Sequence, residues 1–368
     1  MKRNVLLNPG PGTTSQSVKE ALVVPDICPR EREFGQLMAG IAKDLVRVVH
    51  GGDDYTAVLF ASSGTGALEA AIASAVPRDK KLLVVENGAY GTRMAQIAEV
   101  LGIETVRYRI PYGDYPNLHA IEELIGQHPD LSHLAAVHHE TTTGMLNPVE
   151  KIADVATSRG LDTIIDAVSS FAGIPIDLHS MKATFLVSTS NKCIQGMPGL
   201  SFVICKKDAL AKLTPGKRGF YFDLPAQHRY FEEHLQTRFT PPVQVIYALR
   251  QALDEYFTET EEGRQRRYRD NWNLLYNGMT GMGFRPLLNP AYESHILTAF
   301  CEPSDPAYSF EAMHNHLLSK GYTIYPGKGA AKNTFRLSVL GDLHRADITG
   351  FLNTLQNWVR DRKIEFRY

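Results

Sequence analysis

Apolar residues along the chain fall into short runs of strand length, separated by longer stretches with helical spacing. Between about residues 55 and 205, seven runs rich in Val, Ile and Leu predict strands. These runs are Ala57–Phe60, Leu82–Glu86, Thr105–Arg109, Leu134–His138, Thr163–Asp166, Phe185–Ser188 and Ser201–Cys205. The helical patterns between them include Ala67–Val76, Thr92–Leu101, Leu118–Ile125 and Val149–Ser158. This alternation predicts an α/β fold with a mostly parallel seven-stranded sheet covered on both faces.

The pattern changes after Pro241-Pro242, where a charged helical stretch extends to about Tyr276. Shorter strand and helix patterns follow at His295–Phe300, Phe310–Ser319, Tyr322–Tyr325, Phe335–Val339 and Ile348–Val359. We therefore expect a large domain over residues 1–240. Residues 241–368 should form a long linking helix and a smaller C-terminal α/β domain. The string from Arg264 to Arg269 is expected to be a solvated face of that long helix.

Composition narrows the class of protein. The 368 residues are 43% hydrophobic and 21% charged, with a net charge of −1, which is typical of a soluble globular protein. No basic surface for nucleic acid is expected, and no apolar run reaches the ~18 residues of a membrane span. The four cysteines are scattered and Pro9 interrupts any signal-peptide core, so reduced thiols and a cytoplasmic location are expected. His138 and His139 point to opposite faces of a strand, so no metal site is expected.

Small and hydroxyl-bearing residues join the first predicted strand to the next helix, in Ser62-Ser63-Gly64-Thr65-Gly66. Backbone N–H groups at the positive end of a helix dipole make such a turn suitable for a phosphate. An ordinary turn with a Ser/Thr cap has the same appearance. A nucleotide-binding dehydrogenase is a further alternative, but the segment matches neither GxGxxG nor GxxxxGK[ST].

Two later strands end in residues with acid–base chemistry. Asp166 closes an apolar strand, where a carboxylate either caps the next turn or pairs with a buried cation such as a protonated pyridine nitrogen. Lys192 follows another apolar strand, and a lysine amine with a lowered pKa can form a Schiff base. A surface lysine in a loop is the plainer interpretation. The order of turn, aspartate and lysine favours a pyridoxal 5′-phosphate (PLP) site.

Two further residues fit such a site. Tyr90, in Asn87-Gly88-Ala89-Tyr90-Gly91, follows a strand, so its ring could stack on a pyridine ring or simply pack in the core. Arg336 lies inside an apolar strand pattern and must find an anion there. That anion is either a substrate carboxylate or an acidic side chain.

Together these motifs resemble the class V aminotransferases from Leu6 to the C-terminal helix. The resemblance rests on Asn8-Pro9-Gly10-Pro11, Ser63-Gly64-Thr65, Asn87–Gly91, Glu140–Gly144, Asp166–Ser170, Asn191–Gly196 and Phe335-Arg336. Within that family, Glu140–Pro148 and Asn191–Gly199 are most similar to the subgroup acting on 2-aminoethylphosphonate and pyruvate.

The resemblance implies a homodimer of PLP fold type I, with each active site between large domain, small domain and partner subunit. It implies that Lys192 is the Schiff-base lysine and that Asp166 pairs with the pyridinium nitrogen. It also implies that Tyr90 and Thr141 contact the cofactor ring, and that Arg336 binds the substrate carboxylate. The residues implied to bind the cofactor phosphate are Ser63, Gly64 and Thr65, with Asn191 close by. Thr240 is implied to reach the phosphate of the neighbouring subunit's cofactor.

The implied reaction converts 2-aminoethylphosphonate and pyruvate into phosphonoacetaldehyde and L-alanine. Alanine–glyoxylate or serine–pyruvate transamination on the same fold is the main alternative. The sequence departs from the subgroup at Asp26–Phe34, where a Trp- and Asp-rich segment is expected. Arg30 and Arg32 there either attract a phosphonate or, as we favour, begin a surface helix with Arg–Glu pairs. Lys217 and Arg218 are further phosphonate candidates.

Overall fold

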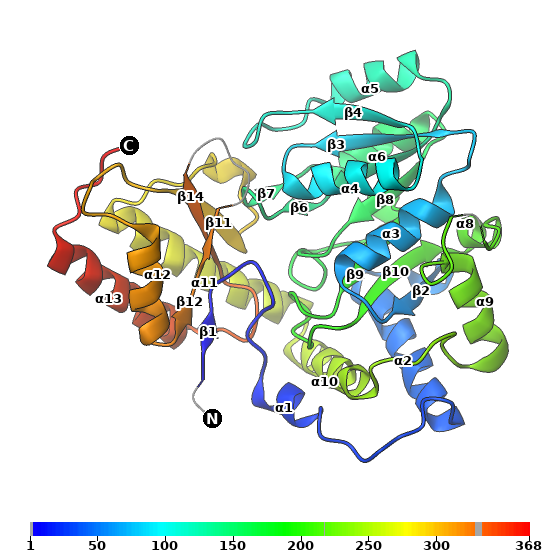
Figure 1. Ribbon diagram of the computed structural model, residues 1–368, viewed down its shortest axis with the longest axis horizontal. Helices are drawn as coiled ribbons and strands as arrows, with labels where there is room; N and C mark the ends of the chain where they lie inside the picture. Colours follow the sequence, from blue (N-terminus) through cyan, green and yellow to red (C-terminus); the bar gives the residue numbers. More distant parts are fainter. Residues whose placement is uncertain (1–2, 217, 328–332) are drawn as a thin grey trace.

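The computed structural model describes residues 3–216, 218–327 and 333–368. Figure 1 shows a larger body around a central sheet and a smaller body that carries both chain termini. In the larger body the strands are β2 (Tyr55–Phe60), β3 (Lys81–Glu86), β4 (Thr105–Arg109), β5 (Leu131–Val137), β8 (Asp162–Asp166), β9 (Phe185–Thr189) and β10 (Ser201–Lys206). All seven predicted strands therefore form, with shifts of a few residues at their ends.

These strands make one sheet in the order β2-β10-β9-β8-β5-β3-β4. Strand β10 is antiparallel to both of its neighbours, and every other pair is parallel. The prediction of a mostly parallel seven-stranded sheet is confirmed. Parallel strands bring their carboxyl ends to one edge, so the loops after β2, β3, β5, β8 and β9 meet there.

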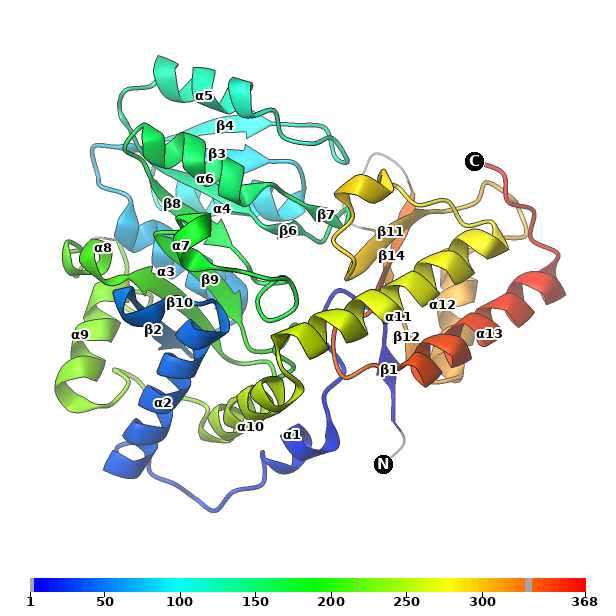
Figure 2. The ribbon, with the colours of Figure 1, turned by 180° about the vertical axis from the view of Figure 1, so that it is seen from behind.

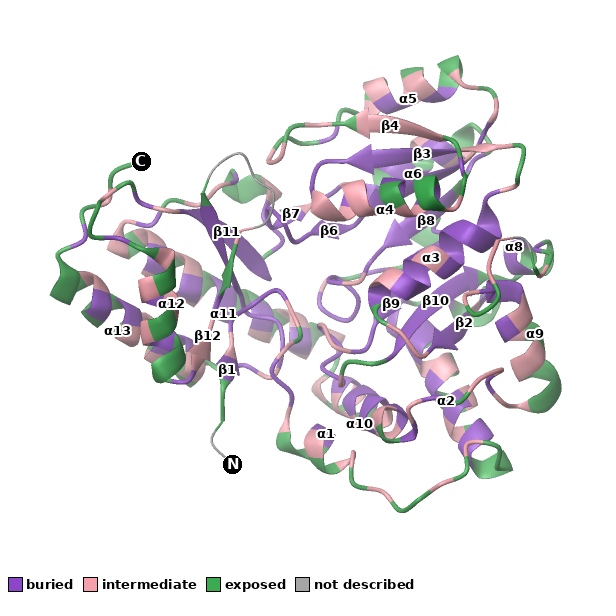
Figure 3. Cartoon of the chain, in the orientation of Figure 1, coloured by how far each residue is buried: buried purple, intermediate pink, exposed green. Residues whose placement is uncertain are grey.

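Helices cover both faces of the sheet. The helices of the larger body are α2 (Arg32–Val48), α3 (Gly64–Ala75), α4 (Ala89–Val100), α5 (Leu118–Gln127), α6 (Val149–Ser158), α7 (Leu178–Met181), α8 (Lys207–Ala211), α9 (Leu224–His234) and α10 (Val243–Glu259). Along β3, Leu82 and Val84 belong to the hydrophobic cluster that contains residues of α3 and α4, whereas Leu83 and Val85 belong to the cluster that contains residues of α2, α5, α6 and α10. Both faces are therefore buried, and the central strands are buried throughout in Figure 3.

The smaller body is built on a three-stranded antiparallel sheet in the order β11-β14-β13. Its elements are β11 (Leu297–Cys301), α12 (Phe310–Ser319), β12 (Tyr322–Thr323), β13 (Tyr325–Pro326), β14 (Thr334–Ser338) and α13 (Arg345–Arg362). Helix α11 (Glu261–Met282) packs against α13 and spans this body in Figure 2. Short elements complete the fold: β1 (Val5–Leu6), α1 (Gln16–Glu20), the hairpin β6 (His139–Glu140) and β7 (Met145–Leu146), and 3₁₀ turns at Gly52–Asp54 and Pro290–Tyr292.

The prediction of a single long helix after Pro242 is wrong, because two helices, α10 and α11, lie there. The helical stretch breaks at Thr260, which adopts φ +67° and whose side chain accepts a hydrogen bond from the N–H of Gly263. The hydroxyl caps α11, so the chain turns between α10 and α11 without leaving that helix end unsatisfied. No Gly or Pro lies directly beside Thr260 in the sequence, and this is why the sequence pattern concealed the break.

The hydrophobic clusters divide the chain differently from a boundary at residue 240. Strand β1 pairs with β12, and Val5 and Leu7 pack in the small-domain cluster. Helix α10 packs instead with the large-domain cluster. The N-terminal segment therefore crosses between the bodies, and the turn at Thr260 separates the two cores better than Thr240 does.

Candidate active site

The carboxyl ends of β8 and β9 bring Asp166 and the Lys192 loop to one edge of the sheet. Asp166 is the last residue of β8 and pairs in register with Val187 of β9. The N–H of His138, after β5, donates to the Asp166 carbonyl at 2.9 Å. Lys192 follows the end of β9 by three residues. The two residues singled out from the sequence therefore come from neighbouring strands.

The amine of Lys192 lies against the N-terminal segment. Its Nζ donates to the Pro9 carbonyl at 2.5 Å. Gly10 has φ +121°, and a Cβ there would overlap the end of the Lys192 side chain. Burial lowers the pKa of Lys192 to about 8, and the positive charge of Arg336 acts in the same direction. A larger share of neutral, nucleophilic amine at neutral pH follows.

Asp166 is a buried carboxyl group, 3% exposed. One oxygen accepts from the N–H of Val168 at 2.9 Å, as a capping group does. Burial raises its pKa to about 6, and the charge of Glu140 adds to this rise. No cation forms an ion pair with it among the described residues. A carboxylate placed in this way stabilises a cation brought by a ligand.

The predicted phosphate turn is the N-terminus of α3. Ser63 is its N-cap residue, and its hydroxyl makes no capping hydrogen bond. A cavity of about 600 Å³ adjoins this turn, and its polar lining includes Ser63, Thr189, Asn191 and Thr240. Here Thr240 lies on the same cavity as Ser63 and Asn191 of its own chain. The helix terminus, the free hydroxyl and the cavity together suit a phosphate.

Tyr90 lies in the first turn of α4, because that helix begins three residues before the predicted Thr92. The guanidinium carbon of Arg93, one turn on, lies 4.8 Å from the centre of the Tyr90 ring. Arg93 also donates to the hydroxyl of Thr65 at 3.3 Å. It therefore connects the ring position to the phosphate turn, and the sequence interpretation did not include it.

Arg336 brings the small domain into the site. It is 5% exposed on β14, and its guanidinium donates to the carbonyls of Thr141 and Pro326, both at 3.2 Å. No ion pair to an acidic side chain forms among the residues that the structure describes. Burial lowers its pKa, whereas the Tyr90 hydroxyl raises it. Among the described residues, Arg336 therefore does not form a structural salt bridge with an acidic side chain, which was the alternative interpretation.

Thr141 contacts Arg336 through its main chain, and the ring contact that the resemblance implies for it stays a prediction. It is buried, and its carbonyl is the group that Arg336 holds. Its neighbour Glu140 is fully buried and accepts hydrogen bonds from the N–H groups of Tyr90 and Gly91, at 3.1 and 3.3 Å. Glu140 thus caps α4, a role that only the tertiary contact reveals.

The prediction that the string from Arg264 to Arg269 forms a solvated helix face is wrong for Arg264. Arg264 is 1% exposed, its Nε forms an ion pair with Glu259, and its Nη1 donates to the Cys193 carbonyl at 2.7 Å. A half-buried carboxylate and a carbonyl receive the charge, so the burial of Arg264 is tolerated. Charged residues at helical spacing do not reveal such partners.

Neither Arg30 nor Arg218 forms a hydrogen bond to a predicted site residue among the described residues. Arg218 donates to the carbonyls of Ala73, Val76 and Pro77, at the far end of α3 from the phosphate turn. Arg30 contacts the side chain of Gln236 and the carbonyl of Thr237, both at 3.0 Å. Arg32 begins α2, as favoured, but among described residues neither Arg30 nor Arg32 forms the expected Arg–Glu pair. Lys217 lies outside the described residues.

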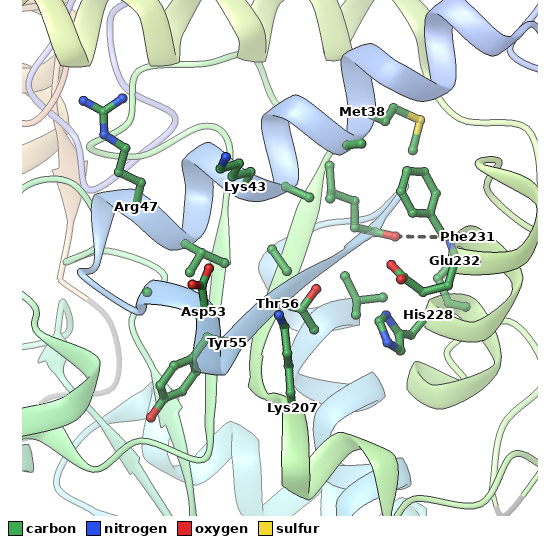
Figure 4. Close-up of a pocket in the computed structure, with 18 of the residues that line it drawn as sticks. Met38, Lys43, Arg47, Asp53, Tyr55, Thr56, Lys207, His228, Phe231 and Glu232 are labelled. Atoms are coloured by element: carbon green, nitrogen blue, oxygen red, sulfur yellow. Dashed lines mark hydrogen bonds between the residues drawn. The ribbon is translucent and has the colours of Figure 1, made fainter.

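A separate hollow of about 640 Å³ lies between α2, β2 and α9 (Figure 4). Met38 and Phe231 contribute apolar surface, and Lys43, Lys207 and Glu232 contribute charge. None of the predicted site residues lines it, so it is not the candidate active site.

The residues at the sheet edge fit PLP group by group. Asp166 offers an unpaired buried carboxylate for the ring nitrogen, and Lys192 offers an amine of lowered pKa for the aldehyde. The terminus of α3 offers donors for the phosphate. Among the described residues no cluster of His, Cys, Asp and Glu could hold a metal ion. Within the same residues, no helix has both the length and the apolar character needed to cross a membrane.

Comparisons with known proteins agree with this chemistry. The family model "Aminotransferase class-V" matches residues 20–303. A 2-aminoethylphosphonate–pyruvate transaminase of Klebsiella pneumoniae is 41% identical over 356 residues, covering 96% of this chain and 97% of that protein. One from Vibrio vulnificus is also 41% identical, covering 96% of each. An alanine–glyoxylate aminotransferase structure from Nostoc sp. superposes with a TM-score of 0.90 at 25% identity, covering 98% of this chain and 96% of that one. The chain therefore belongs to the class V aminotransferases.

Proposed function

We propose that this aminotransferase transfers the amino group of 2-aminoethylphosphonate to pyruvate, giving phosphonoacetaldehyde and L-alanine. The substrate pair follows the two relatives that share 41% of its residues over nearly their whole length. The residues at the sheet edge supply the groups that such a reaction requires.

PLP, when bound, supplies a ring that withdraws electrons from the carbon that loses its proton. In this proposal Nζ of Lys192 would hold the cofactor. As a free amine, the same Nζ would accept the proton from the substrate carbon that bears nitrogen. Its lowered pKa of about 8 suits this role, because a neutral amine is the form that accepts a proton.

Asp166 keeps the ring nitrogen protonated in this proposal. Burial raises its pKa to about 6, although the positive charges of Arg93 and Lys192 act in the opposite direction. A cation beside it favours the ionised form and lowers that pKa. Tyr90 and Val168 both pack against the same hydrophobic cluster and are partly buried, so in this proposal they orient the ring.

The single observation that carries the proposal is the buried guanidinium of Arg336. Its partners are the main-chain carbonyls of Thr141 and Pro326 and the hydroxyl of Tyr90, and no carboxylate pairs with it among the described residues. A buried cation of this kind is stabilised by an anion, and a carboxylate pairs with a guanidinium in a bidentate geometry. We propose that the carboxylates of pyruvate and alanine bind there.

We further propose a cytoplasmic homodimer with shared active sites. Thr240 is exposed on the cavity beside Ser63, so a second subunit can approach it. Three of the four free cysteines are buried as thiols, which suits a reducing compartment.

Single half-reactions with a panel of amino donors test the substrate assignment. The PLP-loaded enzyme is mixed with 2-aminoethylphosphonate, L-alanine or L-serine without a keto acid, and the loss of near-visible absorbance is timed. We expect aminoethylphosphonate and alanine to react faster than serine, with phosphonoacetaldehyde detected as a product. A faster reaction with serine, and none with aminoethylphosphonate, would move the function to serine–pyruvate transamination.

A further inference from the structure

Two side chains of α11, in the small domain, reach the residue that follows Lys192. Nη1 of Arg264 donates to the Cys193 carbonyl at 2.7 Å, and the hydroxyl of Tyr268 donates to the same oxygen at 3.3 Å. Arg264 and Tyr268 are each 1% exposed. Hydrogen bonds from the small domain therefore fix the peptide group that joins Cys193 to Ile194, next to Lys192.

The Tyr268 hydroxyl is a junction for three parts of the chain. Besides donating to Cys193, it accepts from the amide of Gln195 at 2.8 Å and from the N–H of Gly341 at 3.1 Å. One donor and two acceptor positions are the full capacity of a phenol. Gln195 has φ +67°, and its N–H donates to the Lys192 carbonyl at 2.9 Å. Tyr268 thus contacts both ends of the turn that begins at Lys192.

Glu259 joins this junction to the loop after Arg336. Its carboxylate pairs with Arg264 and with Arg267, the latter at 2.6 Å. Arg267 in turn donates to the carbonyls of Gly341 and Leu343, at 2.9 and 3.0 Å. That loop directly follows β14, the strand that carries Arg336. The same network therefore contacts the lysine loop and the segment beside the carboxylate-binding arginine.

We propose that Tyr268 and Arg264 are positioning residues that fix the Lys192 loop against the small domain. They act through the Cys193 peptide, and they keep the amine in its water-poor position beside Pro9. A small misplacement of a reacting group costs a large factor in rate, so the contact affects proton transfer more than substrate binding. The inference rests on the proposed role of Lys192, but not on aminoethylphosphonate as the donor.

Tyr268→Phe tests the inference, with Tyr308→Phe as its matched control. Both tyrosines are buried in the same small-domain cluster, but the Tyr308 hydroxyl has no hydrogen-bond partner among the described residues. The first readout is the pH dependence of PLP capture by the apoenzyme, followed by growth of the near-visible band. Capture requires the neutral amine. In Tyr268→Phe, water reaches Lys192 more freely, so the midpoint should rise by about half a pH unit or more above its original value near 8.

The second readout is the half-reaction with L-alanine and with alanine deuterated at the α-carbon. Tyr268→Phe should slow it about ten-fold, with less than about a two-fold change in half-saturating alanine and a larger isotope effect. Tyr308→Phe should match the unmodified enzyme in both readouts. Equal midpoints and equal rates in the two variants, with only a lower Tm in Tyr268→Phe, would show that Tyr268 merely stabilises the fold.

Arg264→Lys provides a second variant should Tyr268→Phe fail to fold. It keeps a positive charge beside Glu259 but withdraws the forked donor from the Cys193 carbonyl. The same upward shift in midpoint and the same slower proton transfer are expected. An unchanged pH midpoint and an unchanged alanine half-reaction would overturn the inference. If the unmodified enzyme reacts with alanine but not with aminoethylphosphonate, the proposed substrate is contradicted. The inference about Tyr268 and Arg264 would still stand.

Discussion

Individual residues at the site are held in states that cost stability in the absence of a ligand. Asp166 is a buried carboxyl group whose pKa is raised from 3.8 to about 6. Arg336 is a buried cation that has no carboxylate partner among the described residues; it contacts two main-chain carbonyls and the Tyr90 hydroxyl. Both costs fall once an ion of opposite charge binds, which is how a binding site differs from a structural ion pair.

Asp166→Asn should stabilise the apoenzyme at neutral pH. Because the folded pKa lies above the unfolded one, the destabilisation by Asp166 is absent below about pH 4 and complete above about pH 6. The variant should therefore gain roughly 3 kcal/mol in unfolding free energy at pH 7 and nothing at pH 4. Urea unfolding of the PLP-free protein measures this. Asp162→Asn, at the exposed start of the same strand, is the control. A gain that is equal at both pH values would contradict the assigned cause.

Arg336→Met should weaken binding of the keto acid without weakening the fold. Loss of a charged pair of hydrogen bonds should raise KM for pyruvate by about 100-fold, whereas removal of a buried cation leaves the apoenzyme at least as stable. Steady-state kinetics and thermal unfolding report the two effects separately. Arg285→Met, on an exposed residue of the same domain, should change neither. An unchanged KM for pyruvate with a large loss of Tm would make Arg336 a structural residue.

Residues whose type alone signals chemistry could be predicted from the sequence, but residues whose role depends on a distant partner could not. Asp166 stands out because it ends an apolar strand, and Lys192 stands out because it closely follows another. Glu140 and Arg264 look like ordinary charged residues until the fold brings Tyr90 and Cys193 to them. Burial of a charge is a tertiary property, so periodicity cannot show it.

Helices and strands could be predicted best where the hydrophobic pattern of the sequence is uninterrupted. Most of the seven strands are largely apolar and buried, with the edge strand β4 as the exception, and each pattern located its strand to within a few residues. The break at Thr260 and the early start of α4 were missed, because each depends on a cap. Thr260 supplies its own hydroxyl, and Glu140 reaches α4 from a separate hairpin.

The cap on α4 links an element to the site and yields a prediction for Glu140→Ala. A Cβ on Gly88 would overlap the Glu140 carboxyl group, which shows how closely that group fits the helix terminus. Its removal leaves the N–H groups of Tyr90 and Gly91 unpaired, at a cost of about 1–3 kcal/mol. We expect a lower Tm together with weaker PLP binding, measured by titrating the near-visible band. Glu123→Ala, on exposed α5, should change neither. Normal PLP affinity at a lower Tm would confine Glu140 to stability.

At the scale of the whole molecule, the site depends on parts of the chain far apart in sequence. Pro9 contacts Lys192, Arg336 contacts Thr141, and Thr240 lies on the cavity beside Ser63. If the proposed dimer shares its sites, Thr240 also serves the cofactor of the partner subunit.

Mixed dimers of Lys192→Ala and Thr240→Ala chains test that sharing. If Thr240 acts across the interface, one site in each mixed dimer combines an intact Lys192 with an intact Thr240. The mixture should then regain PLP affinity and turnover that neither parent dimer has. Parent dimers mixed without subunit exchange provide the control. If Thr240 acts within its own chain, no mixed site is intact and nothing is regained.

The absorption spectrum of the purified protein tests the central claim most directly, namely that a Lys192-centred PLP site carries out both half-reactions. A near-visible band should disappear when 2-aminoethylphosphonate is added alone and return when pyruvate follows, and Lys192→Ala should lack this cycle. A protein that shows no such band even after incubation with PLP would contradict the account.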